Sequence, residues 1–330
     1  MEYGKLTVSA LRLLCKERAI RGVSKARKAD IVALLESTHL EPSDAEPAPA
    51  AETVVPTDEA VAPGNEVIAP LRQEVVHGDT LQVLPALDDD SAQIILADPP
   101  YNIGKDFGND SDKQEMDTYL QWCDKWIAEC LRVLKPNGTM FIYGFSETLA
   151  YISTRVPMNI PRRWLIWHYT NKNVPSLNFW QRSHESILVL WKSGKVFHRD
   201  DVREPYTDTF LKGAAGKERR PTKGRFSKGD KSTVYTAHAD GALPRDVIKV
   251  PALAGGAGKK ERVDHPTQKP LALCDKLLRS CQQPATDGYV LIPFAGSGSE
   301  CVAAKKLDLP FIGIELNADY VALTNKRLQA

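Results

Sequence analysis

The sequence lacks several features that would place the protein in a membrane or outside the cell. None of its 330 residues fall in an apolar run of about 18, the length that a membrane-spanning helix needs. Residues 1–10 lack the apolar core of a secretion signal. Charge of one sign is also absent, since 43 Lys and Arg balance 42 Asp and Glu to a net charge of +1. We therefore expect no membrane partner and a cytoplasmic location.

Cysteine is scarce and carries no metal-binding spacing. The six cysteines form no CxxC pair, and Cys123/Cys130 and Cys274/Cys281 are spaced as two helical turns would place them. Buried thiols in a reducing cytoplasm are therefore the expectation, with no metal site.

The near-neutral total conceals three blocks of different charge. Residues 1–40 carry eight basic and four acidic side chains, whereas residues 41–65 carry six acids, no base and no aromatic residue. The second block is rich in Pro and Ala and cannot bury enough apolar surface to offset the entropy of ordering. We predict a small basic module at 1–40, a disordered linker at 41–70 and a large domain at 71–330.

The first block has helical periodicity on both sides of a basic stretch. Leu6, Leu11 and Leu14 fit one short helix, and Ile31 with Leu35 fits a second. The segment resembles the helix–extended-loop–helix modules of the SAP type and of the Rho amino-terminal family, which commonly bind nucleic acid. The alternative is a basic helical hairpin that docks on the main domain. The candidate phosphate contacts are Arg18, Arg21, Lys25, Arg27 and Lys28.

Strands and helices alternate through the large domain. Such alternation predicts one α/β domain with a doubly wound, mainly parallel sheet. The expected strands are Glu74–Asp79, Ala92–Ala97, Thr139–Tyr143, Trp164–Tyr169, Glu185–Trp191, Tyr289–Pro293 and Phe311–Ile314. The expected helices are Thr80–Leu87, Tyr119–Leu134, Ala272–Cys281, Glu300–Lys306 and Ala318–Leu328.

The tetrapeptide Asp98-Pro99-Pro100-Tyr101 directly follows the apolar run Ala92–Ala97. In a doubly wound sheet the carboxyl end of a strand opens onto the ligand crevice. The prolines stiffen the chain and cannot donate hydrogen bonds. The Asp98 carboxylate and the Pro99 carbonyl can accept both hydrogens of an exocyclic amine, while Tyr101 offers a ring on which a base can stack. A rigid surface turn is the structural alternative.

A second element combines Gly296-Ser297-Gly298 with Glu315 at the end of the next strand. The glycines let the backbone approach a cofactor closely, and Glu315 is placed to bind two ribose hydroxyls. The unit predicts a cofactor that carries a nucleoside. NAD is the obvious rival, but the full GxGxxG spacing is absent.

These elements together resemble a known family. DPPYNIG, HPTQKP (265–270), FAGSGS (294–299) and GIELNADYV (313–321) are similar to motifs of the amino-methyltransferases of DNA, in which S-adenosyl-L-methionine methylates an exocyclic base nitrogen. The tetrapeptide precedes the glycine loop, as in the circularly permuted β arrangement of restriction–modification and orphan adenine methylases. The resemblance covers about residues 72–330 and implies a permuted, seven-stranded methyltransferase sheet.

The resemblance implies roles for individual residues. Asp98 and Pro99 would hold the target amine and Tyr101 would stack on the extruded base. Lys269 would neutralise the cofactor carboxylate, and Asp79 would lie near the cofactor's adenine. The remaining residues expected to line the cofactor or flank its methionine end are His265, Thr267, Phe294, Gly296, Ser297, Gly298 and Glu315.

One position departs from the family pattern. The family usually has an acidic residue before Pro293, whereas this chain has Ile292. That carboxylate helps orient the methionine end of the cofactor in the family. Weaker cofactor binding, replacement by another residue and an inactive copy are the alternatives, and an active enzyme is the prediction because the other motifs are intact.

DNA contacts are expected in a variable target-recognition region at about 196–262. Residues 203–231 hold nine basic and four acidic side chains and four glycines. A solvated basic loop is the alternative to a DNA-binding one. The candidate DNA contacts in this region are Arg219, Arg220, Lys223 and Arg225.

The predicted reaction is methylation of adenine N6 in duplex DNA after base flipping. Cytosine N4 and a catalytically impaired DNA-binding protein with a methylase fold remain alternatives, whereas protein glutamine methylation conflicts with Asp98 and with the motif order. Double-stranded DNA is the expected partner. A homodimer and a cognate restriction endonuclease are further expectations from the resemblance.

Overall fold

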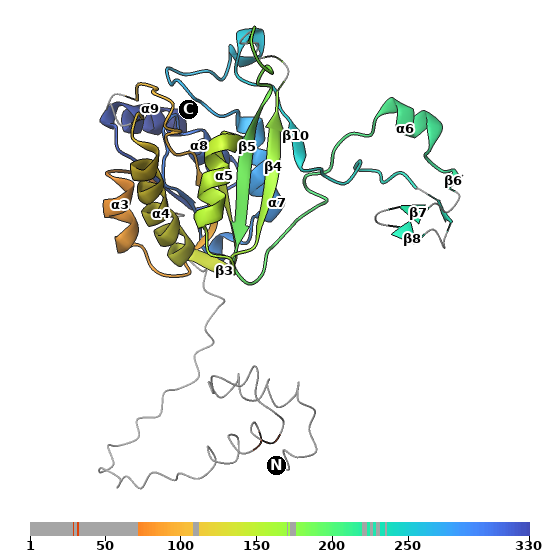
Figure 1. Cartoon of the computed structure of the whole chain (residues 1–330), viewed down its shortest axis with the longest axis horizontal. Helices are drawn as coiled ribbons and strands as arrows, with labels where there is room; N and C mark the ends of the chain where they lie inside the picture. Colours follow the sequence, from red (N-terminus) through yellow and green to blue (C-terminus); the bar gives the residue numbers. More distant parts are fainter. Residues whose placement is uncertain are drawn as a thin grey trace, which may run out of the picture. The chain divides into compact units, whose positions relative to one another are not determined.

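The computed structural model describes most of the large domain (Figure 1). The described residues are Ala29, Val32 and 72–330 apart from 108–111, 170, 172–175, 220–222, 225–226, 229–231 and 235. The predicted module at 1–40 and linker at 41–70 therefore lie outside the described residues, apart from those two positions. The same holds for five candidate DNA contacts in the module, which are Arg18, Arg21, Lys25, Arg27 and Lys28, and for Arg220 and Arg225.

A mainly parallel sheet forms the centre of the domain (Figure 1). Its eight strands are β1 (Gln73–His77), β2 (Ala92–Ala97), β3 (Leu134–Gly144), β4 (Arg162–His168), β5 (His184–Trp191), β10 (Val247–Lys249), β11 (Tyr289–Ile292) and β12 (Phe311–Glu315). Their spatial order is β1-β12-β11-β2-β3-β5-β4-β10. Only β5 runs antiparallel to its two neighbours, β3 and β4. The predicted α/β fold with a mainly parallel sheet is confirmed.

The predicted strand count and the irregular region at 196–262 need correction. The sheet has eight strands because Val247–Lys249 pairs in parallel with Ile166–His168 at its edge. This strand has three residues, and only Ile248 is buried, so no periodicity marked it. The same region holds α6 (Asp208–Gly213) and two small sheets, formed by β6 (Glu218–Arg219) with β9 (Thr233–Val234) and by β7 (Lys223–Gly224) with β8 (Ser227–Lys228).

Helices cover both faces of the sheet. On one face lie α3 (Thr80–Val83), α4 (Met116–Val133) and α5 (Ser146–Arg155), and on the other α7 (Leu271–Cys281), α8 (Ser299–Lys306) and α9 (Ala318–Gln329). Strand β2 is buried along its whole length, with Ile94 and Leu96 in one apolar cluster and Ile95 and Ala97 in the other. Burial on both faces explains its continuous apolar sequence. Short 3₁₀ turns occupy Leu84–Ala86, Gly255–Gly258 and Ala285–Asp287.

Helix α4 buries one face against the sheet. Cys123, Trp126 and Cys130 are buried, whereas Trp122 is half-buried and reaches the cavity described below. The five cysteines among the described residues are free and buried, as predicted, and Cys15 lies outside them. In the described part of the chain, no helix has the length and apolarity that crossing a membrane requires.

Three local predictions differ from the structure. Helix α5 was not predicted. Strand β3 begins at Leu134 and not at the expected Thr139, and its register with β2 shifts between Ala92 and Ile94. The expected helix Thr80–Leu87 ends after one turn and continues as a 3₁₀ turn, because Pro85 cannot donate the next helical hydrogen bond.

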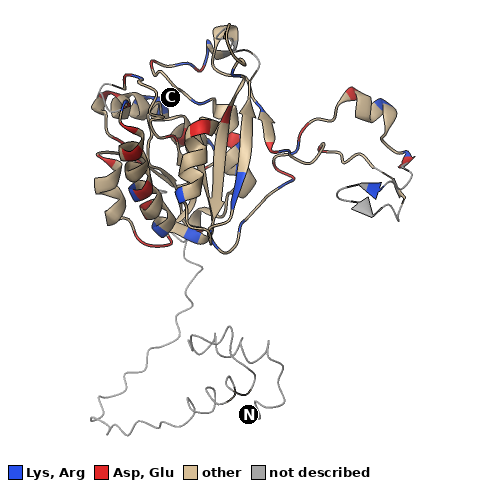
Figure 2. Ribbon diagram, in the orientation of Figure 1, with Lys and Arg blue, Asp and Glu red and all other residues tan. Residues whose placement is uncertain are grey.

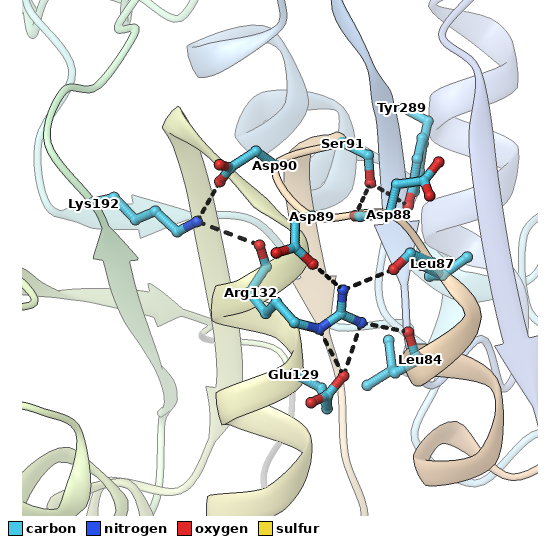
Figure 3. A network of polar contacts seen from close by, with 10 residues as sticks. All are labelled: Leu84, Leu87, Asp88, Asp89, Asp90, Ser91, Glu129, Arg132, Lys192 and Tyr289. Carbon is cyan, nitrogen blue, oxygen red and sulfur yellow. Dashed lines mark hydrogen bonds and ion pairs between the residues drawn. The ribbon is translucent and has the colours of Figure 1, made fainter. Parts of the chain in front are cut away.

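A polar network fixes the end of the domain at which β2 begins (Figure 3). The Arg132 guanidinium, in the last turn of α4, donates to the carbonyls of Leu84 and Leu87 at 2.9 and 2.8 Å. It also pairs with Glu129 and Asp89. The network joins α4 to the connection that leads into β2. It therefore fixes the position of β2, including the carboxyl end of this strand.

Candidate active site

The carboxyl ends of β2, β11 and β12 surround one cavity. These strands are adjacent and parallel, so their ends meet at the same edge of the sheet. Eleven of the predicted site residues line this cavity, namely Asp79, Asp98, Pro99, Pro100, Tyr101, His265, Thr267, Phe294, Gly296, Ser297 and Glu315. Gly298 and Lys269 lie beside it without lining it.

Asp98 is held by a buried ammonium group. The Nζ atom of Lys269 lies 2.7 and 2.6 Å from the two carboxylate oxygens of Asp98 and 3.9 Å from Glu185. Burial lowers the pKa of Lys269, but the negative charges of Asp98 and Glu185 outweigh this effect and raise the pKa above its ordinary value. The structure thus gives Lys269 a partner other than the expected cofactor carboxylate.

Tyr101 is bound from its hydroxyl end. The hydroxyl donates to Asp98 at 2.8 Å and is 3.3 Å from the Glu185 carboxylate. The ring is 7% exposed and packs edge-on against Phe145, with ring centroids 5.2 Å apart. Burial, together with the charges of Asp98 and Glu185, raises the pKa of Tyr101 well above its ordinary value. The residue is therefore a neutral hydroxyl that orients Asp98, in addition to any stacking.

The two prolines of the tetrapeptide differ in their carbonyl groups. The Pro100 carbonyl accepts a hydrogen bond from the Tyr119 hydroxyl at 2.8 Å. Among the described residues, none donates to the Pro99 carbonyl. The following loop is fixed by Asp112, whose carboxylate accepts the backbone N–H groups of Asn102 and Lys105. An acceptor is thus left open beside Asp98 on a stiff segment.

The glycine loop approaches its neighbours too closely for side chains. Gly296 and Gly298 have φ angles of +49° and +75°, a region that glycine adopts without strain. A Cβ atom on Gly296 would meet the His265 ring, and one on Gly298 would meet Thr324. Gly298 therefore faces Thr324 and not the cavity, and it contributes to the conformation of the loop without lining the cavity.

Glu315 is oriented by the backbone. One of its oxygens accepts from the Gly296 N–H at 2.7 Å and the other from the Asn317 N–H at 2.8 Å. A carboxylate has about four acceptor positions, so each oxygen keeps capacity for a hydroxyl donor in the cavity. This geometry suits a ribose.

Asp79 and His265 also have local partners. The Asp79 carboxylate caps α3 by accepting the Leu81 N–H at 2.7 Å. Burial lowers the pKa of His265 to about 4, so its ring is neutral at physiological pH. Its Nδ1 atom accepts the Thr267 N–H at 3.3 Å, and its ring packs edge-on against Tyr320. These contacts fit a wall residue better than a proton carrier.

Several wall residues were not predicted from the sequence. Trp122 lines the cavity beside the predicted Phe294, with ring centroids 5.5 Å apart, whereas the buried Trp126 packs against Phe294 at 5.2 Å without lining the cavity. Glu300 is a buried carboxylate that also lines it. The sequence feature that could have identified Glu300 is its spacing on α8. It lies three and four residues before Ala303 and Ala304, which are buried, and residues at this spacing share one face of a helix.

The candidate DNA contacts are described only in part. The backbone of Arg219 lies in β6, and Lys223 is exposed in β7. The ribbon of α6 carries both a basic and an acidic segment in Figure 2, which correspond to Lys212 and Asp208. Among the described residues, no group of three or more His, Cys, Asp or Glu side chains is placed to hold a metal ion.

The arrangement of helices and strands has a counterpart among solved structures. The PvuII DNA methyltransferase, named as cytosine-N4-specific, matches with a TM-score of 0.54 over 77% of this chain and 85% of that chain, at 14% sequence identity. The fold is therefore a methyltransferase fold.

Sequence comparison identifies the family. The family model of N6 and N4 methylases, described as "DNA methylase", matches residues 92–326. The DNA adenine methyltransferase YhdJ of Escherichia coli K12 is 30% identical over 256 residues, covering 77% of this chain and 82% of the relative. The type II methyltransferase M.HpaI of Haemophilus parainfluenzae is 28% identical over 263 residues, covering 78% and 74%. The chain belongs to the N6/N4 DNA methylase family, whose members are S-adenosylmethionine-dependent DNA methyltransferases.

Proposed function

We propose that the protein transfers the methyl group of S-adenosylmethionine to the N6 atom of adenine in duplex DNA, after the nucleotide has left the base stack. The observation that carries the proposal is the pair of acceptors at the cavity edge, the Asp98 carboxylate and the open Pro99 carbonyl. The initial Asp of the tetrapeptide and the adenine-specific name of a 30% identical relative support adenine over cytosine.

The cavity fits the cofactor in shape and in chemistry. The close backbone of Gly296 leaves room for a nucleoside, Glu315 offers acceptors for ribose hydroxyls, and Phe294 offers an aromatic surface. When bound, S-adenosylmethionine supplies an electrophilic methyl group on a sulfonium. The residues of the chain have to bind it, orient it and exclude water from it.

The target amine is positioned by acceptors that face it from two directions. The Asp98 carboxylate, paired with the Lys269 ammonium, accepts a hydrogen bond from one amine hydrogen, while the Pro99 carbonyl accepts one from the other. These two bonds direct the nitrogen lone pair away from the acceptors. Rate enhancement then arises from orientation and from the fixed charges around the amine. No covalent bond to the enzyme is needed, which agrees with the buried position of the described cysteines.

Taking a base out of the stack costs on the order of a few kcal/mol in lost stacking and pairing. A side chain of the protein can fill the space that the base leaves. The connection between β4 and β5 carries three large exposed apolar side chains, Leu177 (94%), Phe179 (80%) and Trp180 (87%). This connection lies at the same end of the sheet as Asp98, which follows the carboxyl end of β2. The reason is that β5 runs antiparallel to β3 and begins where β3 ends. Apolar side chains of this kind act as wedges between base steps.

Analysis of methylated nucleosides tests the proposal. DNA lacking methylated bases is incubated with the full chain and S-adenosylmethionine, digested to nucleosides and separated with mass detection. N6-methyladenine is the expected product. N4-methylcytosine alone would contradict the adenine assignment, and the absence of both, with DNA still bound, would favour the DNA-binding protein with a methylase fold.

A further inference from the structure

Glu300 is a buried carboxylate that forms no ion pair within the described residues. Its side chain is 2% exposed and lines the cavity from the first turn of α8. Within the described residues, its side-chain hydrogen bond is donated by the Cys274 thiol, with the sulfur 3.6 Å from the oxygen. A thiol is a weak donor, and an uncompensated carboxylate is costly to bury.

The other cavity carboxylates already have stronger donors. Asp98 pairs with the Lys269 ammonium, Glu315 accepts two backbone N–H groups, and Asp79 accepts the Leu81 N–H. The ion pairs of Lys269 are with Asp98 and Glu185. Among the cavity carboxylates of the described residues, Glu300 is therefore the one whose side chain accepts its hydrogen bond from a thiol, the weakest of these donors.

The positive charge near Glu300 does not offset its burial. Burial and the nearby charge of Asp98 raise the pKa of Glu300 to about 7, although the Lys269 ammonium acts in the opposite direction. The end of strand β11 adds no carboxylate at this side of the cavity, since residue 292 is an isoleucine buried in the same apolar cluster as Cys274. A ligand cation that enters the cavity would meet Glu300 as the acceptor that still lacks a strong donor.

We propose that Glu300 binds the α-ammonium group of the methionine part of S-adenosylmethionine. The inference rests on the proposed function, because it assumes that this cofactor occupies the cavity. The cofactor has two positive groups, the sulfonium and the ammonium. The ammonium carries three N–H donors and can form hydrogen bonds with a carboxylate, whereas a sulfonium has none to donate. Glu300 thereby supplies the carboxylate that residue 292 does not.

Three ligands separate this role from others. S-adenosylmethionine has both positive groups, S-adenosylhomocysteine keeps the ammonium without the sulfonium, and 5′-methylthioadenosine has neither. Their affinities for the full chain and for Glu300→Gln are measured by calorimetry without DNA. Asp308→Asn is the control, since Asp308 is an exposed acid that follows α8. The variant Glu300→Gln keeps the shape of the side chain and removes its charge.

We expect Glu300→Gln to weaken the first two ligands about tenfold or more and to leave 5′-methylthioadenosine and the control unchanged. Loss for S-adenosylmethionine alone would assign Glu300 to the sulfonium and overturn the proposal. Equal loss for all three ligands would mean a structural role, and no loss would mean no contact. A wild-type chain that binds none of the three would contradict the proposed function itself, and the inference with it.

Discussion

The ammonium group of Lys269 lies within 2.7 Å of both carboxylate oxygens of Asp98, although 170 residues separate the two in the sequence. Lys269 is 2% exposed and Asp98 lies at the cavity. The charges of Asp98 and Glu185 raise the pKa of the buried Lys269 ammonium, so Lys269 stays charged beside Asp98. The contact makes Lys269 a positioning residue for Asp98.

Replacing Lys269 separates this role from direct binding of the cofactor carboxylate. In Lys269→Gln we expect kcat for methylation to fall roughly 100-fold, the scale of one lost oriented donor, with the S-adenosylmethionine Kd changed less than about threefold. Both are measured on purified protein. Lys276→Gln is the control, because Lys276 pairs with Glu204 and does not line the cavity. A large rise in Kd with kcat preserved would return Lys269 to the cofactor.

The Tyr101 hydroxyl and ring have separable contributions. Tyr101→Phe keeps the ring and removes the hydroxyl that donates to Asp98, so we expect kcat to fall about tenfold, the effect of one lost buried hydrogen bond. Tyr101→Ala also removes the ring and should lose more. Steady-state methylation assays compare them. Full activity of Tyr101→Phe would leave stacking as the sole role.

The stability of the unliganded protein should depend on pH through Glu300. Because its pKa is raised to about 7, the folded chain holds a proton there that the unfolded chain releases near pH 4.5. The contribution of Glu300 to the free energy of unfolding is greatest below pH 4.5, where both states hold the proton. This contribution declines as the pH rises to 7. Above pH 7, Glu300→Gln should be more stable than wild type by about 3 kcal/mol. The charged or titratable neighbours that share this environment are Asp98, Lys269, Cys274, Cys301 and Arg327.

Urea unfolding of both proteins at pH 5 and pH 8 measures this difference. A difference between wild type and Glu300→Gln that is the same at the two pH values would contradict the raised pKa. The substitution is expected to stabilise the protein while weakening the cofactor, a cost of keeping a charge in place for its ligand.

The amino-terminal block should add affinity for DNA without sequence specificity. Its basic residues suit phosphates, and a linker of about 25 residues reaches about 25–30 Å. Deleting residues 1–65 should weaken DNA binding at moderate salt and leave the methylated motif and the cofactor affinity unchanged. Binding titrations across a salt series measure the effect. A truncated chain with full DNA affinity at every salt concentration would point to a protein partner for the block.

Local sequence was enough to predict those elements whose burial is continuous. Strand β2 has the predicted bounds because both of its faces are buried. Strand β10 was not predicted, since three residues at an edge carry no period. Helix α5 has few apolar residues on its buried face, Leu149 and Ile152, and gave little signal.

The site shows the same division. Residues directly after strands, such as Asp98 and Glu315, were placed at the cavity because the ends of parallel strands share an edge. The contact of Lys269 with Asp98 and the position of Glu300 at the cavity depend on how distant segments pack together. Spacing along the chain does not give those distances. The resemblance assigned Lys269 to the cofactor, and the structure places its ammonium on Asp98.

The most direct test of the account is the single-turnover rate of methyl transfer by Asp98→Asn, measured with cofactor and DNA at saturating concentrations. The variant keeps the shape of the side chain but removes its charge, and Asp275→Asn, on the surface of α7 and paired with Arg279, is the control. We predict that the rate falls roughly 1000-fold, the scale of losing one oriented group at the reacting atoms, while the Kd values for S-adenosylmethionine and DNA stay within about threefold of wild type. A rate within tenfold of wild type would contradict the claim that Asp98 holds the target amine.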